Sequence, residues 1–304
     1  MSTVEVLQRA EAIVGEGPVW DARTQTLHWV DILSGTAHAL RPDGSTDTFR
    51  VDGHLAGVLP TVDPAQSLLL MRDGFRLRAS DGSLRDLAVP LAEHPGIRFN
   101  DGKVDPRGRA FGGTMAYDWQ QGDPVGALYR LDAPADALDS PAPSVGSAAT
   151  VIEASTRLSN GMGWSPDGTL FYFTDSGAQT TYVYDYDLET GTPSRRRVFV
   201  EIPAADGLPD GLAVDDDGCV WIALHGAGAL RRYTPSGVLE RTVQLPATQV
   251  TSLCFIGPRR DTIAVTSARY LLGEDALAQQ PLAGSVFAFD APSAGPAATP
   301  WSPR

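Results

Sequence analysis

A short pattern occurs six times along the chain, and it restricts the fold more than any other feature. Each copy has an apolar anchor residue, a turn that contains Asp, Pro or Gly, and a run of apolar and aromatic residues. Such turns reverse the chain and the flanking runs have β-strand composition, so each copy predicts a β-hairpin. The anchors are Trp20, Val62, Val104, Trp164, Val214 and Phe255, separated by 42, 42, 60, 50 and 41 residues.

A third strand is expected after each hairpin, and a weaker fourth strand after most of them. The third strands begin at Thr36, Phe75, Ala127, Tyr182, Ala229 and Ser285. Four antiparallel strands at a period in the forties predict an all-β fold, a six-bladed β-propeller of four-stranded antiparallel blades, with residues 1–304 forming one domain. The two longer spacings are explained by a Pro/Ala/Ser-rich insertion at 132–149 and an extended hairpin at 179–200.

The last repeat lacks a convincing fourth strand, because only Pro- and Ala-rich sequence follows its third strand. The N-terminal segment 3–10 is an unassigned strand. We therefore expect this strand to complete the last blade and to close the ring, which leaves no open sheet edge there. Two stacked β-domains are the alternative, and the even distribution of the repeats argues against it.

Charge and composition exclude several classes of protein. The formal net charge of −13, from 37 acidic and 24 basic residues, argues against a nucleic-acid partner or an anionic membrane surface. No apolar run approaches the roughly 20 residues of a membrane-spanning helix, and the first residues lack the pattern of a secretory signal, so a cytoplasmic protein is expected. Cys219 and Cys254 are too few for a disulfide framework and wrongly spaced for a zinc site.

One position of the repeat is rich in oxygen-bearing side chains. Four residues before the anchors stand Glu16, Val58, Asn100, Asn160, Asp210 and Thr251. Equivalent positions of a closed propeller meet around its axis, so Glu16, Asn160 and Asp210 should converge there, with Asn100 nearby. Oxygen ligands suit Ca²⁺, Mg²⁺ or Mn²⁺, whereas Zn²⁺ and Fe²⁺ more often recruit His or Cys. The alternative interpretation is structural, because Asn-Gly and Asp-Gly are also ordinary turn dipeptides.

A second position, fifteen residues further along, should return to the same end of the ring. It holds Asp31, Asp73, Met115, Asp175 and His225. We interpret the three aspartates as structural, since Asp at a strand end commonly accepts hydrogen bonds from loop amides. His225 remains open between a substrate contact and a packing residue.

Several long segments resemble a known family. They are GEGPVWD at 15–21, RFNDGKVDPRGRAFGGTM at 98–115, NGMGWSPDGTLFYFTDS at 160–176, PDGLAVDDDGCVWIA at 209–223 and DALAQQPLAGSVFAF at 275–289. They resemble the senescence-marker/gluconolactonase/luciferin-regenerating-enzyme family, which includes regucalcin, and look most like bacterial sugar lactonases. The resemblance implies a six-bladed propeller whose central channel holds one divalent ion on a Glu, an Asn and an Asp, here Glu16, Asn160 and Asp210.

The same resemblance implies the substrate contacts. Arg98 and Asn100 match the family's substrate-binding Arg and Asn, and Asp118 stands where regucalcin-like members carry a Glu, one methylene longer. Lys103, the only lysine in the chain, lies within the second segment, and we expect it to support the site rather than to act as a catalytic amine.

The function implied is metal-dependent hydrolysis of a sugar (aldono-)lactone to the sugar acid. The divalent cation, expected to be Ca²⁺ with Zn²⁺, Mn²⁺, Mg²⁺ or Fe²⁺ as alternatives, would polarise the lactone carbonyl, and Asp210 would act as the base. The partner is then a small sugar lactone, and the protein a monomer or a small homo-oligomer. Two alternatives stay open, a non-catalytic metal-binding regulatory propeller and a related esterase or phosphotriesterase.

Overall fold

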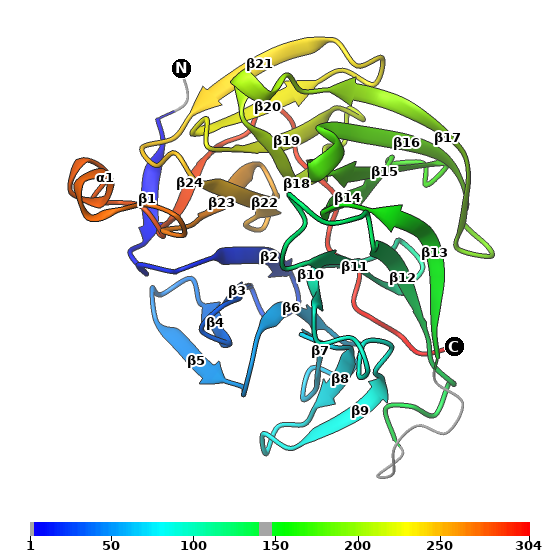
Figure 1. Cartoon of the computed structure of the whole chain (residues 1–304). Helices are drawn as coiled ribbons and strands as arrows, with labels where there is room; N and C mark the ends of the chain where they lie inside the picture. Colours follow the sequence, from blue (N-terminus) through cyan, green and yellow to red (C-terminus); the bar gives the residue numbers. More distant parts are fainter. Residues whose placement is uncertain (1–2, 140–147) are drawn as a thin grey trace.

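The computed structural model describes residues 3–139 and 148–304, and within these ranges the strands form a ring of six antiparallel sheets. Each sheet has four strands and forms one blade, and the innermost strands of the blades converge on a common axis (Figure 1). The prediction of an all-β, six-bladed propeller is confirmed.

The blades follow the chain in order. Blade 1 contains β2 (Gly15–Asp21), β3 (Thr26–Asp31), β4 (Thr36–Leu40) and β5 (Thr46–Arg50); blade 2 contains β6 (Leu55–Pro60), β7 (Ser67–Met71), β8 (Phe75–Arg78) and β9 (Leu84–Ala88); blade 3 contains β10 (Ile97–Val104), β11 (Ala110–Ala116), β12 (Gly126–Asp132) and β13 (Ala148–Thr156). Blade 4 contains β14 (Ser159–Trp164), β15 (Leu170–Asp175), β16 (Thr180–Asp187) and β17 (Thr192–Glu201), and blade 5 contains β18 (Leu208–Val214), β19 (Val220–His225), β20 (Ala229–Tyr233) and β21 (Leu239–Gln244). Each predicted hairpin forms the two inner strands of a blade.

Blade 6 is completed by the N-terminal strand, as predicted. Its strands β22 (Val250–Ile256), β23 (Thr262–Ser267) and β24 (Val286–Asp290) come from the end of the chain, and β1 (Glu5–Gln8) pairs with β24 in antiparallel register, with Glu5 opposite Ala288. Because the two ends of the propeller share one sheet, this pairing closes the ring (Figure 1).

The hydrophobic core lies between neighbouring blades. One buried cluster joins Trp221 of blade 5 to Phe255, Phe287 and Phe289 of blade 6. The innermost strands β6, β14 and β22 are buried at every position, whereas the outer strand β21 is exposed along most of its length. Burial of these aromatic and branched side chains holds the blades together and so fixes where the inner strands point.

Each innermost strand in the described residues has a shift in its pairing register near its start. The shifts lie between Glu16 and Val19, Leu55 and Gly57, Phe99 and Asp101, Ser159 and Met162, Pro209 and Leu212, and Val250 and Leu253. Such an irregularity bends a strand and changes the direction of its side chains. It falls at the position where the sequence predicts that oxygen-bearing side chains converge.

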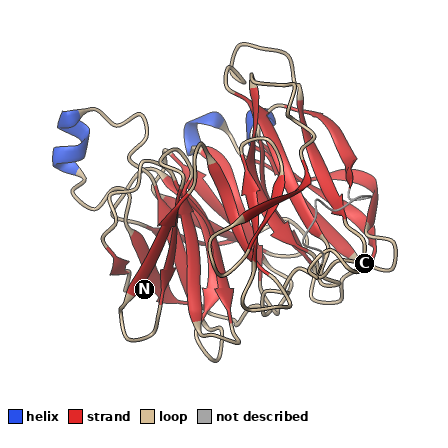
Figure 2. Ribbon diagram, turned by 90° about the horizontal axis from the view of Figure 1, so that it is seen from below, coloured by secondary structure: helices blue, strands red, loops and turns tan. Residues whose placement is uncertain are grey.

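The two faces of the ring differ in what covers them. The 3-10 helices η1 (Ser176–Ala178) and η2 (Ala204–Asp206) and the helix α1 (Glu274–Gln279) lie on one face (Figure 2).

No helix in the described ranges is both long and apolar enough to span a membrane. The extended hairpin expected at 179–200 is confirmed as β16 and β17, while part of the insertion expected at 132–149 (residues 140–147) lies outside the described residues.

The other face is crossed by residues 291–304, which we call the C-terminal strap. At one end Asp216 N–H donates to the Ala294 carbonyl, and at the other Trp301 N–H donates to the Pro60 carbonyl. The Trp301 side chain is buried. The strap therefore ties the hairpin turn of blade 5 to blade 2, across the end of the central channel.

Candidate functional site

Three oxygen-bearing side chains from three blades occupy the centre of the ring. Glu16 lies on β2, Asn160 on β14 and Asp210 on β18, and they are only 4%, 3% and 6% exposed. Glu16 and Asp210 interact electrostatically, and Asn160 lies next to Asp210. The predicted convergence of these three residues is what the structure shows; their role as metal ligands remains a prediction.

Some oxygens of this cluster lack hydrogen-bond donors. Among the described residues, Asn160 Oδ1 and Asp210 Oδ1 are buried and have no hydrogen-bond partner. Asn160 Nδ2 donates to Ser176 Oγ at 3.0 Å, and Gly17 N–H donates to Glu16 Oε2 at 2.8 Å. A buried polar atom without a partner is costly, so the arrangement favours a cationic ligand.

The electrostatics of the cluster also favour a cationic ligand. Burial raises the pKa of Glu16 well above its ordinary value, and the neighbouring Asp210 and Asp101 carboxylates raise it further. Burial also raises the pKa of Asp210, with Asp101 again adding to the shift. The Asn160 side chain and the Gly211 amide lower the pKa of Asp210, and the Gly17 amide lowers that of Glu16. Arg98 acts in the same direction on both carboxyls, but none of these contacts reverses the shifts. Three carboxyl groups are thus buried close together, and a nearby positive charge would stabilise their ionised forms.

Asp101 is a member of this cluster that the sequence analysis missed. It is 6% exposed, its Oδ1 accepts the Gly102 N–H at 2.7 Å, and burial raises its pKa. Counting along the repeat selected only Asn100, because ideal strand alternation directs neighbouring residues to opposite faces. The register shift between Phe99 and Asp101 breaks that alternation. The DG dipeptide at 101–102 was the signal in the sequence.

Glycines let the innermost strands approach closely beside the cluster. A Cβ atom on Gly161 would lie 2.2 Å from the Leu212 nitrogen, and one on Gly211 would lie 2.2 Å from Ser252 Oγ. Any larger residue would push the neighbouring inner strands apart. The lack of a side chain at these two glycines thus allows the inner strands to pack closely beside the cluster.

Arg98 and Asn100 lie beside the carboxylates on β10. Both are 8% exposed, an Arg98 Nη atom donates to Asn100 Oδ1 at 2.8 Å, and Asn100 Nδ2 donates to the Ser159 carbonyl at 3.1 Å. Burial lowers the pKa of Arg98, while Glu16 and Asp210 act in the opposite direction. The structure therefore brings both predicted substrate-binding residues to the cluster, with a guanidinium held by hydrogen bonds next to two carboxylates.

Asp118 is placed differently from the other predicted residues. It lies in the loop after β11 and is exposed, and no hydrogen bond or ion pair joins its side chain to Arg98, Asn100 or the carboxylates in the described part of the chain. Its neighbour Tyr117 is 46% exposed and hydrogen-bonds His54 Nδ1 at 3.0 Å.

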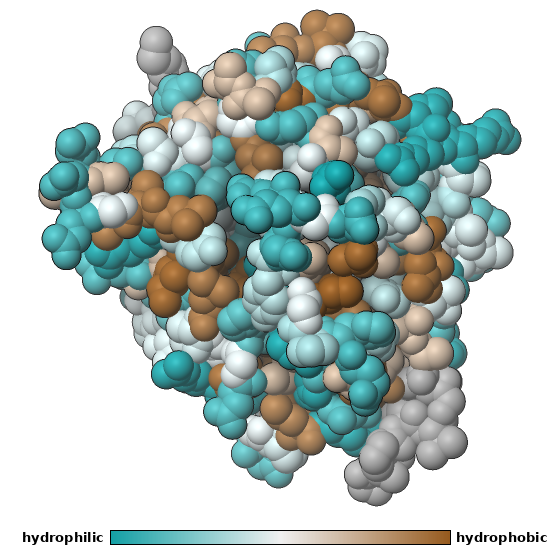
Figure 3. All heavy atoms as spheres, in the orientation of Figure 1, coloured by the Kyte–Doolittle hydropathy of each residue, from teal (hydrophilic) through white to brown (hydrophobic). Residues whose placement is uncertain are grey.

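Aromatic side chains and His54 surround Arg98 on the helix-bearing face. Tyr117 and Tyr270 both interact electrostatically with Arg98, and Arg98 helps to lower the pKa of His54. The sequence analysis missed His54 and Tyr270. The face seen in Figure 3 mixes hydrophilic and hydrophobic side chains rather than presenting one apolar surface.

The aspartates at the second repeat position, fifteen residues after the first, have structural roles. The carboxylate of Asp31 accepts the N–H groups of Ile13 and Val14, and that of Asp175 accepts those of Arg157 and Leu158. Asp73 is paired with Arg76. His225 has a pKa lowered by burial to about 4, so it is neutral at physiological pH.

A divalent ion fits this donor set. No cluster of three or more His, Cys, Asp or Glu side chains suited to a metal was found among residues 3–139 and 148–304. The predicted ligands Glu16, Asn160 and Asp210 instead combine two carboxylates with an amide oxygen. All three side chains are buried, and Asn160 and Asp210 each have an oxygen without a hydrogen-bond partner. Carboxylate and carbonyl oxygens suit hard divalent ions such as Ca²⁺ and Mg²⁺.

Fold and site together define a six-bladed propeller with a carboxylate-rich centre, and comparison with known proteins identifies its family. The family model described as SMP-30/Gluconolactonase/LRE-like region matches residues 14–269. The chain therefore belongs to this family, which confirms the resemblance noted in the sequence.

Named relatives resemble the chain over most of its length. It is 39% identical over 257 residues to pentonolactonase XacC from Haloferax volcanii, which covers 84% of this chain and 81% of that protein. It is 35% identical over 292 residues to regucalcin from Danio rerio, covering 93% of this chain and 92% of that protein. The crystal structure of a calcium-binding regucalcin from Agrobacterium tumefaciens superimposes with a TM-score of 0.89 at 28% identity, covering 99% of this chain and 97% of that one.

Glu16 gives a test of the electrostatics of the cluster. In protein stripped of divalent ions by a chelator, Glu16→Gln should raise the melting temperature by an amount that grows as the pH rises above about 4.3, the ordinary pKa of glutamate. The raised pKa means that the native state holds a proton that the unfolded state releases, so ionisation of Glu16 costs stability as the pH rises. Gln cannot ionise and escapes this cost. Melting curves from pH 4 to 7 measure the difference in melting temperature between the variant and the unchanged protein.

The exposed Glu93 supplies the control, since Glu93→Gln should shift the melting temperature little at any pH. A Glu16→Gln difference that stays constant over the same range would contradict the electrostatic description of the cluster.

Proposed function

We propose that this protein is a metal-dependent lactonase that opens a sugar lactone to the corresponding sugar acid. The observation that carries the proposal is the buried cluster of Glu16, Asn160 and Asp210, with unpaired oxygens, beside the guanidinium of Arg98. Relatives named pentonolactonase and 6-deoxy-6-sulfogluconolactonase, 39% and 35% identical to this chain, support the reaction class.

Glu16, Asn160 and Asp210 would hold one divalent cation, for which Ca²⁺ is our first expectation. A bound divalent ion would supply Lewis-acid polarisation of the lactone carbonyl at neutral pH. A solved relative described as a calcium-binding protein supports the choice of ion.

Asp210 would act as the general base. Its Oδ1 accepts no hydrogen bond from the described residues, so it is available to take a proton from a water molecule. That water attacks the lactone carbonyl carbon, the ring C–O bond breaks, and the departing ring oxygen takes up a proton to become the hydroxyl of the open acid. Negative charge develops on the carbonyl oxygen during the attack, which makes nearby positive charge valuable.

Arg98 and Asn100 would hold the substrate beside this base. The guanidinium has several N–H donors in a fixed plane. Among residues 3–139 and 148–304, its recorded acceptors are the Phe99 carbonyl and Asn100 Oδ1. Its remaining donors can therefore bind sugar hydroxyls or the ring oxygen. Asp118, exposed on the loop after β11, would reach the substrate only from the rim.

A panel of substrates tests the proposal. After treatment with a chelator, aldonolactones should be hydrolysed only when a divalent ion is restored, and faster than aryl esters or phosphotriesters. A pH-indicator assay with Ca²⁺, Mg²⁺, Mn²⁺ and Zn²⁺ in separate reactions measures this. Ion binding without lactone turnover would leave the regulatory propeller as the function, and turnover of aryl esters or phosphotriesters alone would favour the related esterase.

Asp210→Asn tests the base. Asn keeps an oxygen for the ion but cannot accept the proton, so kcat should fall about 100- to 10,000-fold while ion binding is reduced less. Steady-state kinetics and ion titration of the same preparation separate the two effects. Asp216→Asn, an exposed aspartate of the β18–β19 turn, is the matched control. Full retention of kcat in Asp210→Asn would remove Asp210 from the base role.

Arg98→Ala tests substrate positioning. Losing charge-assisted hydrogen bonds to a substrate should raise KM about 10- to 100-fold with a smaller change in kcat. Arg259→Ala, which removes an arginine whose side chain is 85% exposed, should leave both constants unchanged. A fall in kcat at unchanged KM would instead assign Arg98 to stabilisation of the transition state.

A further inference from the structure

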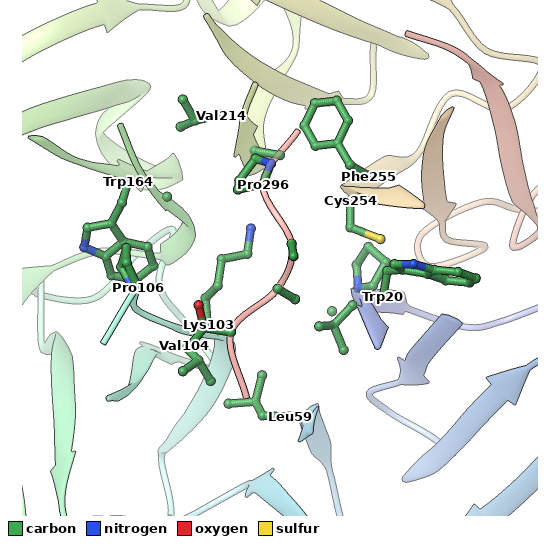
Figure 4. Close-up of a pocket in the computed structure, with 18 of the residues that line it drawn as sticks. Trp20, Leu59, Lys103, Val104, Pro106, Trp164, Val214, Cys254, Phe255 and Pro296 are labelled. Atoms are coloured by element: carbon green, nitrogen blue, oxygen red, sulfur yellow. The ribbon is translucent and has the colours of Figure 1, made fainter. Parts of the chain in front are cut away.

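The central channel contains a cavity at the end closed by the C-terminal strap. Its volume is about 220 Å³. The walls come mainly from apolar side chains, including Trp20, Trp164, Val104 and Phe255, and the strap residues 296–299 pass across it (Figure 4). On the inner strands, the lining residues Trp20, Val104 and Trp164 come after the residues of the central cluster. They therefore lie nearer the face opposite the helices. Glu16, Asn160 and Asp210 do not line this cavity.

The cavity wall contains one cation, the ammonium group of Lys103. The side chain extends among the lining residues (Figure 4), and its Nζ donates to the Leu212 carbonyl at 2.9 Å. An ammonium group has three donors, and within the described part of the chain this is its one recorded hydrogen bond. The side chain is partly buried, and this burial lowers the pKa of Lys103.

No carboxylate forms an ion pair with Lys103 in the described part of the chain. Asp101 also lines the cavity and acts on Lys103 electrostatically, but it is not within salt-bridge distance. A partly buried ammonium without an ion-pair partner loses hydration, and an anion placed against it would offset part of that cost. The charge of Asp101 would oppose a second negative charge on the same ligand.

We propose that this cavity is a binding site for a small monocarboxylate with an apolar ring, its carboxylate on Lys103 and its ring between Trp20, Trp164 and Phe255. A cavity of about 150 Å³ is enough for benzene, so 220 Å³ accommodates one six-membered ring with a carboxylate group. Aromatic and proline side chains give the ring an apolar surface on several sides. This site is separate from the proposed catalytic cluster and does not depend on the lactonase assignment.

The strap provides the route into the cavity. Pro296, Ala297 and Ala298 are exposed, and the backbone hydrogen bonds that hold the strap lie on either side of them, at Gly295 and at Trp301. In the described residues no backbone hydrogen bond fixes the amides of 297–299. This short stretch can move away from the channel without loss of the strap's anchoring contacts.

Benzoate is the probe, and Lys103 reports its binding directly. Because Lys103 is the only lysine, protein grown with ¹³C-lysine gives one lysine Cε resonance. Benzoate should shift this resonance saturably, whereas neutral benzamide of the same shape should not at equal concentration. Calorimetry should show an affinity at least tenfold weaker for Lys103→Met, since Met keeps the length of the side chain but not the charge. Absence of saturable benzoate binding would overturn the proposal.

Two further variants locate the ligand. Arg107→Met removes an exposed cation of the same β10–β11 hairpin and should leave benzoate affinity unchanged. Arg98→Ala should also retain binding, because Arg98 does not line the cavity. Loss of binding in Arg98→Ala with retention in Lys103→Met would place the probe at the catalytic cluster and contradict the proposal. The resonance of the native protein gives the decisive answer if Lys103→Met does not fold.

Discussion

The approach of Glu16 and Asp210 at the centre of the ring is the interaction on which the site depends. The two carboxylates come from blades 1 and 5 and are buried together with Asp101, so each raises the free energy of the other's charged form. Only a closed ring can hold such distant residues together, because each inner strand is positioned by packing against its neighbours. The pairing of β1 with β24 is therefore as necessary to the site as the side chains themselves.

Local backbone features adapt the propeller to this central cluster. A sheet of ideal alternation would direct every second residue of an inner strand to the axis. The register shifts near the starts of the inner strands break this rule at the level of the cluster, and Gly161 and Gly211 allow adjacent strands to approach within contact distance. Neutral partners orient the polar groups without cancelling their charge: Gly17 N–H donates to Glu16, and Ser176 Oγ accepts a hydrogen bond from Asn160 Nδ2.

The sequence predicted the parts of the molecule that repeat. Hairpins, third strands and the closing role of segment 3–10 follow from local turn chemistry and spacing, and so does the convergence of Glu16, Asn160 and Asp210. Asp101 was missed because a register shift cannot be seen by counting residues, and His54 and Tyr270 were missed because they lie in loops outside the repeat. The sequence showed the strap only as Pro- and Ala-rich residues without a fourth strand. It did not reveal the burial of Trp301 or its hydrogen bond to blade 2, because these depend on tertiary contacts.

One strand links the two ends of the channel. β10 carries Arg98 and Asn100 beside the carboxylates, Asp101 between the two regions, and Lys103 in the far cavity. Lys103 also donates to the carbonyl of Leu212, two residues after Asp210, so its removal alters the backbone that supports the proposed base. A change in lactonase activity in a Lys103 variant would therefore not distinguish a ligand site from a supporting contact. Direct measurement of anion binding separates them, because a merely structural lysine would give no saturable response to benzoate.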